Sequence, residues 1–344
     1  MASFKIEIQK FEMQQLIKYL FIVLVFSNTV CSFNCVASHG INSADSVSPL
    51  KAHGIVLSDP IVSCDSSIAV IPFTRAGNLI LIKAKADTTE GNFILDTGAP
   101  NLVLNITYFR DYTSAATSTQ EQGGITGTTT GADPTVIREF SFGPIRYSNL
   151  DADRINLGHI ENSKGLRILG LLGFQLFSRF EMIIDYERSV IYFHLISKKE
   201  ANTYSSDQLQ DTSLYNIFPI TVLDNKLLTT AHLGGKKLMF LIDTGAESNI
   251  LDSRLPDKVF QYVNVTGRVS LAGTGSKKAD ALVGDLKNLK LGDLNISSLP
   301  VVVANLEKMC TAYDRCLDGM LGFDFLSLHK IGFNFVKRKM YIWK

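Results

Sequence analysis

Short apolar or alternating runs, separated by Gly, Asn and Lys, recur along most of the chain. The clearest are NLILIKAKA (residues 78–86) and NFILDT (92–97) in the first half, and KLLTTAHL (226–233) and LMFLIDT (238–244) in the second. Runs of roughly 4 to 8 such residues bounded by turn residues are typical of β-strands. Two short stretches, GFQLFSRF (173–180) and GFDFLSLH (322–329), favour brief helices instead. The pattern predicts an all-β protein.

The runs repeat in order. FILDTGAP (93–100) matches FLIDTGAE (240–247), and Pro72 and Asn78 match Pro219 and Asn225 at the same offset of 147 residues. GLLGF (170–174) matches GMLGF (319–323) at an offset of 149, and MIIDYERSVIYF (182–193) aligns with IGFNFVKRKMYIW (331–343). A single Asp-Thr-Gly is a common turn composition, but its repetition with this spacing is not. The sequence predicts a tandem duplication of a unit of about 125 residues.

The N-terminal region reads as a leader. YLFIVLVF (19–26) is too short to span a bilayer but suits the apolar region of a secretory signal, with small residues before a cut after Ala37. We expect a signal peptide over 1–37, a lead-in over 38–67, a first unit over 68–196, a polar linker over 197–213 and a second unit over 214–344. Lipidation at Cys31 or Cys35 is the minority alternative. The chain is therefore expected to be exported, to the periplasm or the exterior, with no transmembrane segment in its mature form.

Charge and cysteine content narrow the partners. The chain carries 34 Lys and Arg against 33 Asp and Glu, and removal of residues 1–37, with three lysines and two glutamates, leaves a formal charge of zero. This balance argues against a nucleic-acid partner. No Cys/His spacing suits zinc, so no metal or cofactor is expected. Cys310 and Cys316 flank TAYDR, and a disulfide there, worth roughly 2 kcal/mol, is as compatible with the sequence as two unpaired thiols.

The repeated acids, Asp96 and Asp243, are the candidate chemistry. Each ends a buried apolar run, where an ionised carboxylate loses much of its solvation. If the two units pack about a pseudo-twofold axis, the carboxylates face each other and cannot both ionise near neutral pH. They then share one proton, so that one carboxylate serves as general base toward a water and the other polarises a carbonyl.

These motifs resemble the aspartic proteases of the retropepsin type over nearly all of residues 68–344. The resemblance implies two β-barrel lobes in a pseudo-twofold bilobal enzyme, and peptide-bond hydrolysis by Asp96 and Asp243 without metal or cofactor. It also implies support of the active site by Thr97, Gly98, Ala99, Thr244, Gly245 and Ala246. Ala99 and Ala246 provide no hydroxyl donor to lower the carboxylate pKa values, which predicts a mildly acidic to near-neutral optimum.

Family members cover the substrate with a β-hairpin flap, and two Gly-rich stretches are candidates. One contains Gly124 and Gly127 and the other Gly273 and Gly275, with ordinary hairpin turns as the alternative. The residues just after the motifs provide candidate substrate contacts in Asn101, Glu247 and Ser248.

The sequence thus predicts an aspartic endopeptidase that takes a peptide or protein substrate. Because both Asp-Thr-Gly motifs lie in one chain, it is expected to act as a monomer. A non-catalytic peptide-binding module on the same fold, favoured by Pro100, is the alternative, followed by a purely structural secreted β-protein.

Overall fold

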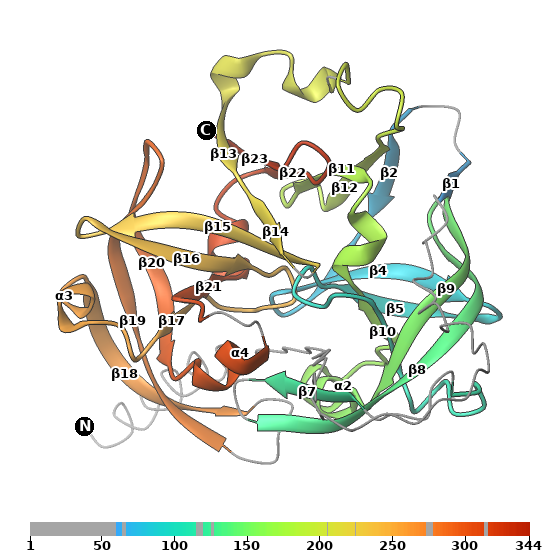
Figure 1. Cartoon of the computed structure of the whole chain (residues 1–344), viewed down its shortest axis with the longest axis horizontal. Coiled ribbons are helices and arrows are strands. Elements are labelled where there is room, and N and C mark those ends of the chain that lie inside the picture. Colours follow the sequence, from blue (N-terminus) through green and yellow to red (C-terminus); the bar gives the residue numbers. More distant parts are fainter. Residues whose placement is uncertain are drawn as a thin grey trace, which may run out of the picture.

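A computed structural model describes residues 60–63, 67–114, 120–124, 127–204, 206–223, 225–272, 278–312 and 316–344. These residues form three sheets, of which two build separate lobes and one joins the lobes (Figure 1). The all-β, two-lobed fold predicted from the sequence is confirmed. The expected signal peptide over 1–37 and most of the lead-in lie outside the described residues.

Lobe 1 is the sheet with strand order β1-β9-β6-β10-β5-β4-β8-β7, with β3 paired to β4. It is antiparallel except where β10 pairs with β5 and β6 with β9. Its strands are β1 (Ile61–Val62), β3 (Thr74–Ala76), β4 (Leu79–Ala86), β5 (Thr89–Leu95), β6 (Leu102–Asn105), β7 (Gln120–Gly124), β8 (Gly127–Phe142), β9 (Ile145–Ile155) and β10 (Gly170–Leu172).

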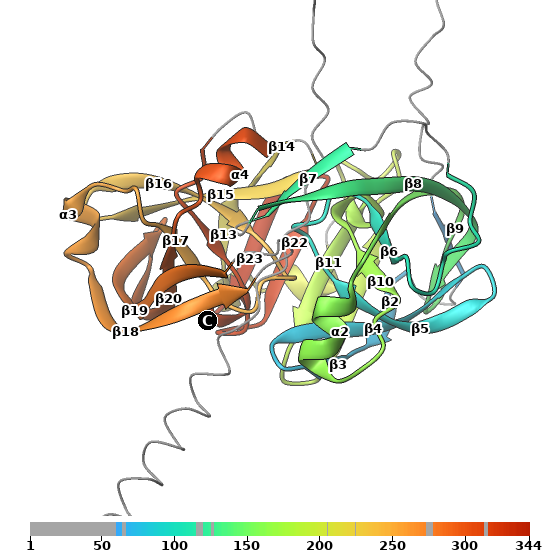
Figure 2. The same cartoon turned by 90° about the horizontal axis from the view of Figure 1, so that it is seen from below.

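Lobe 2 repeats this arrangement in the order β14-β15-β16-β21-β17-β20-β19-β18. The parallel pairs recur as β16 with β21 and β17 with β20. Its strands are β14 (Thr221–Leu223), β15 (Lys226–Leu233), β16 (Lys236–Ile242), β17 (Ile250–Asp252), β18 (Val263–Ala272), β19 (Lys278–Leu291), β20 (Leu294–Ala304) and β21 (Gly319–Leu321). Figure 2 shows the two lobes side by side.

The third sheet draws strands from both halves of the chain, in the order β13-β23-β22-β11-β12-β2. The halves meet where β11 pairs antiparallel with β22, and every residue of β11 is buried, so this strand is covered on both faces. The strands of this interlobe sheet are β2 (Ala69–Pro72), β11 (Phe180–Asp185), β12 (Val190–Leu195), β13 (Tyr215–Pro219), β22 (Ile331–Asn334) and β23 (Lys339–Trp343).

Helices are short and lie between strands. The predicted brief helices after the two Gly-rich motifs are present as the 3-10 turn η2 and the helix α5. The chain also forms α2 and α4 at equivalent places in the two lobes, which the sequence pattern did not predict. The bounds are α2 (Gly158–Lys164), η2 (Phe174–Phe177), η3 (Asp207–Leu209), η4 (Thr212–Leu214), α3 (Asp257–Phe260), α4 (Glu307–Ala312) and α5 (Phe323–Leu326).

The repeated Gly-hydrophobic-hydrophobic-Gly motif has a steric cause. Gly170 opens β10, which runs between β5 and β6, and a Cβ there would lie 2.0 Å from the backbone oxygen of Val103. Gly319 opens β21 in the same setting, 2.4 Å from the oxygen of Ile250. Because such contacts exclude any side chain, only glycine permits the inner strand to approach its neighbours, and it does so in both lobes.

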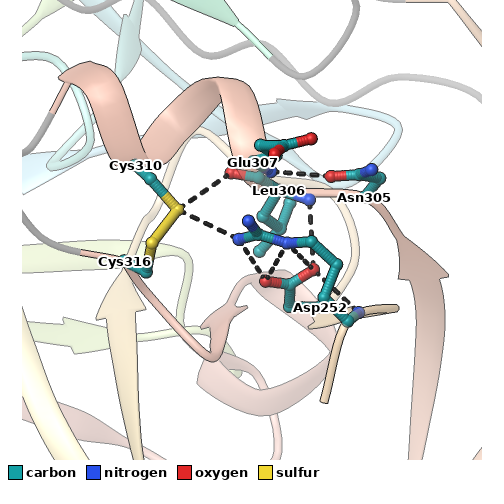
Figure 3. Close-up of a disulfide and its surroundings, with 7 residues drawn as sticks. Asp252, Asn305, Leu306, Glu307, Cys310 and Cys316 are labelled. Atoms are coloured by element: carbon teal, nitrogen blue, oxygen red, sulfur yellow. Dashed lines mark hydrogen bonds and ion pairs between the residues drawn. A yellow bond between two sulfur atoms is a disulfide. The ribbon is translucent and has the colours of Figure 1, made fainter.

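Cys310 of α4 and Cys316 are joined by a disulfide, which decides between the two alternatives left open by the sequence. The bridge lies beside an ion pair between Arg254 and Asp252, and Arg254 Nη2 donates to Cys310 Sγ at 3.0 Å (Figure 3). Asp252 Oδ1 also accepts from the backbone N–H of Leu306, so the end of β17 holds the start of α4.

Candidate active site

Asp96 and Asp243 occupy equivalent positions directly after β5 and β16. The backbone N–H of Asp96 donates to the oxygen of Leu172, and that of Asp243 donates to the oxygen of Leu321, both at 3.0 Å. Each acid is therefore fixed by the inner parallel strand of its own lobe, β10 or β21. The repeated Gly-rich motif is the structural partner of the repeated Asp-Thr-Gly.

Thr97 and Thr244 tie the two lobes together beneath the acids. The Thr97 hydroxyl donates to the oxygen of Ile242 and accepts from the N–H of Thr244, at 3.0 and 3.1 Å. Reciprocally, the Thr244 hydroxyl donates to the oxygen of Leu95 and accepts from the N–H of Thr97, at 2.9 and 3.0 Å. Both residues are buried, so these crossed hydrogen bonds fix the relative position of the two acid loops.

The glycines of the two motifs bring the carboxyl groups together. A Cβ on Gly98 would lie 2.5 Å from Asp243 Oδ2, and one on Gly245 would lie 2.5 Å from the Cγ of Asp96. Each loop thus packs its glycine against the carboxyl group of the opposite lobe, and the two carboxyl groups come close enough to shift each other's pKa values. The site exists only when both lobes are in place.

Backbone donors treat the two carboxyl groups unequally. Asp96 Oδ1 accepts from the N–H groups of Gly98 and Ala99 at 2.9 and 3.0 Å, whereas Asp243 Oδ1 accepts from that of Gly245 at 2.8 Å. Donation to the charged form lowers a carboxyl pKa, so the ionised state is better supported on Asp96.

Burial acts in the opposite direction on both acids, which are 1% and 0% exposed. It raises the pKa of Asp96 to about 6, offset by the hydrogen bond from Asp243 and the backbone donors. Burial and the neighbouring charge of Asp96 raise the pKa of Asp243 well above its ordinary range. Asp243 Oδ2 is buried and has no hydrogen-bond partner among the described residues. The pair is therefore arranged to hold one proton between two carboxyl groups.

The two predicted flaps fall on β-hairpins. Gly124 pairs with Gly127 at the tip of the β7–β8 hairpin. In the β18–β19 hairpin, the strand pair nearest the tip is that between Ala272 and Lys278. Gly273 and Gly275 lie outside the described residues. Strand β7 of lobe 1 lies beside α4 of lobe 2 (Figures 1 and 2).

The three candidate substrate contacts lie in different settings. Asn101 Nδ2 donates to Asp153 Oδ2 at 3.1 Å within lobe 1. Glu247 is 2% exposed and forms an ion pair with Lys164 of lobe 1 at 2.6 Å. Ser248 is 1% exposed, and its hydroxyl oxygen has no hydrogen-bond partner among the described residues. The Glu247 carboxylate thus joins the lobes.

Sequence reasoning missed the partners of Glu247. The N–H of Asn78 donates to its Oε1 at 3.1 Å, and the Asn78 side chain donates to its backbone oxygen. Asn78 recurs in the repeat as Asn225, a signal that could have identified it. Nothing in the sequence identifies Lys164 as a partner of Glu247, because the two residues are far apart in the chain and meet only in the folded structure.

The described ranges hold no cluster of three or more His, Cys, Asp or Glu that could bind a metal ion. In the same part of the chain, no helix is long and apolar enough to cross a membrane.

Comparison with known proteins adds a family. A family model described as aspartyl protease matches residues 82–176 and again 229–325. Each match contains one Asp-Thr-Gly and one Gly-rich motif, which confirms the tandem duplication. No curated protein sequence matches the chain.

Two solved structures are similar to the chain. Conglutin gamma, a unique basic 7S globulin from lupine seeds, is 14% identical with a TM-score of 0.45, covering 80% of this chain and 95% of that one. Basic 7S globulin from soybean is 12% identical with a TM-score of 0.42, covering 80% and 94%. Neither likeness bears on the activity of the present chain.

Proposed function

The chain belongs to the aspartyl protease family, and we propose that it is an aspartic endopeptidase with Asp96 and Asp243 as its catalytic pair. The observation that carries the proposal is the pair itself: two buried carboxyl groups from two lobes, in mutual contact, with both pKa values raised. Purely structural acids in such burial would need cationic partners, and the hydrogen-bond donors to these two among the described residues are backbone N–H groups.

The unequal backbone donors assign the starting roles. Asp96, with two N–H donors, carries the negative charge, and Asp243 carries the shared proton. Asp96 takes a proton from water as the water oxygen bonds to the carbonyl carbon, and Asp243 gives its proton to the carbonyl oxygen. In the second step Asp96 returns a proton to the amide nitrogen, the C–N bond breaks, and Asp243 regains a proton from the collapsing diol. Shared-proton chemistry of this kind is known for the family.

The remaining parts of the proposal follow from the sequence. Thr97, Gly98, Ala99, Thr244, Gly245 and Ala246 hold the pair in position. The β7–β8 hairpin, with Gly124 and Gly127, and the β18–β19 hairpin cover a peptide substrate. Export through the leader at 1–37 places the enzyme outside the cytoplasm, and each chain acts as a monomer with its own complete pair.

Substitution of the two acids tests the function directly. Asp96→Asn and Asp243→Asn, each alone, should lower kcat/KM on a fluorogenic peptide library by about a thousandfold or more, because one proton needs both carboxyl groups. Asp293→Asn, at an exposed acid in the turn between β19 and β20, is the matched control and should retain activity. Circular dichroism and thermal unfolding check that the variants fold. Full activity in either acid variant would contradict the shared pair, and peptide binding without cleavage by the wild type would favour the non-catalytic alternative.

A further inference from the structure

A cavity of about 110 Å³ lies in lobe 2, away from the two carboxyl groups. Its walls come from the segment that follows the second Asp-Thr-Gly, from α5 and from strands β18, β19 and β20. The lining residues are Ser248, Thr266, Val283, Gly284, Asp285, Pro300, Val301, Val302 and Asp324. On the proposed function, the acid loop and the β18–β19 hairpin are the elements that flank a bound peptide, and the cavity lies between this loop and the base of this hairpin.

Two buried polar atoms in this cavity lack partners among the described residues. They are the hydroxyl oxygen of Ser248, a residue only 1% exposed, and Oδ2 of Asp324. The Ser248 hydroxyl and the backbone N–H of Asn249 lie close enough to the Asp324 carboxyl to lower its pKa, but neither reaches Oδ2 in good hydrogen-bond geometry. A buried hydroxyl and a buried carboxylate oxygen without partners are costly, which indicates a missing ligand.

The charge of the cavity selects the ligand. Burial raises the pKa of Asp324 to about 6, and no cationic side chain of the described residues offsets this. Lys287 lies 3.7 Å from Asp285, whose side chain is 38% exposed, and Lys164 neutralises Glu247. Asp324 is thus the acid of the cavity without a counter-charge, and a cation with several N–H donors would satisfy both it and Ser248.

The matched place in lobe 1 holds different polar side chains, and Gln175 Oε1 there also has no hydrogen-bond partner among the described residues. Strand register makes Asn101 equivalent to Ser248, Gln175 to Asp324 and Asp153 to Val302. There the Asn101 amide donates to Asp153, so the carboxylate has an internal donor, and the residue at the position of Asp324 is neutral. The three matched positions therefore hold one acid in each lobe, which is Asp153 with an internal donor in lobe 1 and Asp324 in lobe 2.

We propose that the Ser248–Asp324 cavity is a subsite for a lysine side chain of the substrate, with the ammonium donating to Asp324 Oδ2 and Ser248 Oγ. A water molecule takes up about 30 Å³ in the liquid, so the cavity has room for the end of an extended side chain. The inference rests on the proposed protease function, and it makes the enzyme prefer lysine at one position on one side of the scissile bond.

Peptide cleavage at neutral pH tests the subsite. Matched fluorogenic peptides carrying lysine or norleucine at each position in turn should show a lysine preference in kcat/KM of about tenfold or more at a single position. In Asp324→Asn this ratio should fall to about one. Ser248→Asn, which introduces the amide found in lobe 1, should also reduce it. Gln175→Asn at the equivalent place in lobe 1 is the control and should leave the ratio unchanged.

The ratio of kcat/KM for the lysine peptide to that for the norleucine peptide distinguishes a subsite from a structural role. A variant that only destabilises the fold lowers both kcat/KM values and leaves their ratio unchanged. No lysine preference in the wild type, or a preference that survives in Asp324→Asn, would overturn the proposal and leave a cavity that holds water only. If the wild type cleaves no peptide, a peptide-binding experiment tests the subsite instead. The Asp96→Asn variant should enrich lysine at one position from a mixed peptide library, and Asp96→Asn/Asp324→Asn should not. Enrichment of lysine peptides without cleavage by the wild type would contradict the protease function alone. Equal enrichment by both variants would contradict the subsite.

Discussion

In lobe 1 the loop between α2 and β10 is closed by Glu161, whereas in lobe 2 the loop between α4 and β21 is closed by a disulfide. Glu161 Oε1 accepts from the Tyr108 hydroxyl at 2.6 Å and from the N–H of Ile168 at 2.9 Å. The guanidinium of Arg167 lies 4.4 Å from the centre of the Tyr108 ring.

Strand register makes the two closures equivalent residue by residue. Gly170 and Gly319 open the inner strands of the two lobes, and three residues before them stand Arg167 and Cys316. The carboxamide of Asn105 and the carboxylate of Asp252 accept from the N–H groups of Leu157 and Leu306, and four residues later stand Glu161 and Cys310. The same two positions hold a polar network in one lobe and a covalent bond in the other.

This difference shows what the duplicated fold fixes and what it leaves free. The glycines, threonines and acids at the centre are the same in both lobes, because each contacts the Asp-Thr-Gly motif of the other lobe across the pseudo-twofold axis. The two peripheral loops are closed by contacts within their own lobe, so the chemistry that closes them is free to differ. Variants at the matched centre and variants at the divergent peripheral loops test this contrast separately.

Separation of the lobes should have the largest effect. If residues 1–210 and 211–344 are expressed apart, with the break between the exposed Gln210 and Asp211, each piece should be inactive, because each holds one acid and loses the pairing of β11 with β22. Mixing the pieces should restore activity that depends on concentration, whereas the intact chain should keep a constant specific activity on dilution. Activity assays alongside sedimentation measure both.

Activity in a single piece would show that the acids do not need each other. Loss of specific activity on dilution of the intact chain would show that the functional pair forms between chains.

The pH dependence should reveal the inequality of the two acids. As the pH falls through about 6, Asp96 takes up a proton and the base is lost, so kcat/KM should fall about tenfold per pH unit. As the pH rises toward the higher pKa of Asp243, the remaining proton is lost and the rate falls again. A pH–rate profile should peak near neutrality, with both apparent values assigned to the pair.

A rate maximum at about pH 2 would contradict the raised pKa values of Asp96 and Asp243. Ala99→Ser offers a sharper test, since a hydroxyl that donates to Asp96 should move the acid limb to lower pH. Ala246→Ser is the matched variant in lobe 2.

The ion pair between Lys164 and Glu247 is a point where the lobes are not interchangeable. Pro100 stands at the position of Glu247 in lobe 1 and has no side-chain acceptor, so the mirror-image pair cannot form. Lys164→Met leaves the Glu247 carboxylate buried without its cation, and the free energy of unfolding should fall by about 3 to 5 kcal/mol. Urea unfolding measures the loss. Lys164→Met/Glu247→Gln should recover most of it, and a double variant as unstable as the single one would assign the loss to packing.

The matched centre could be predicted from the sequence, and the divergent periphery could not. Asp96 and Asp243 stand out because the motif around them is duplicated, and the strands before them follow from their apolar runs. Lys164 and Glu247 lie 83 residues apart, and no pattern in either unit pairs them. The helices α2 and α4, with 7 and 6 residues, are too short to show a clear amphipathic period. The disulfide was only one of two alternatives, since spacing does not determine whether two thiols meet.

The smallest effect should come from the loop closures themselves. Cys310→Ser/Cys316→Ser removes a bridge that closes a loop with a sequence separation of 6, and chain entropy predicts a loss of roughly 2 kcal/mol in the free energy of unfolding. A reducing agent should lower the stability of the wild type by a similar amount and leave that of the double variant unchanged. Glu161→Gln is the counterpart in lobe 1. It weakens a charge-assisted hydrogen bond, should cost about 1 kcal/mol, and should leave the response to reduction intact. A wild type indifferent to reduction would mean that the lobe 2 loop, like that of lobe 1, is held by its hydrogen bonds, with Arg254 and Asp252 in the role that Tyr108 and Glu161 have in lobe 1.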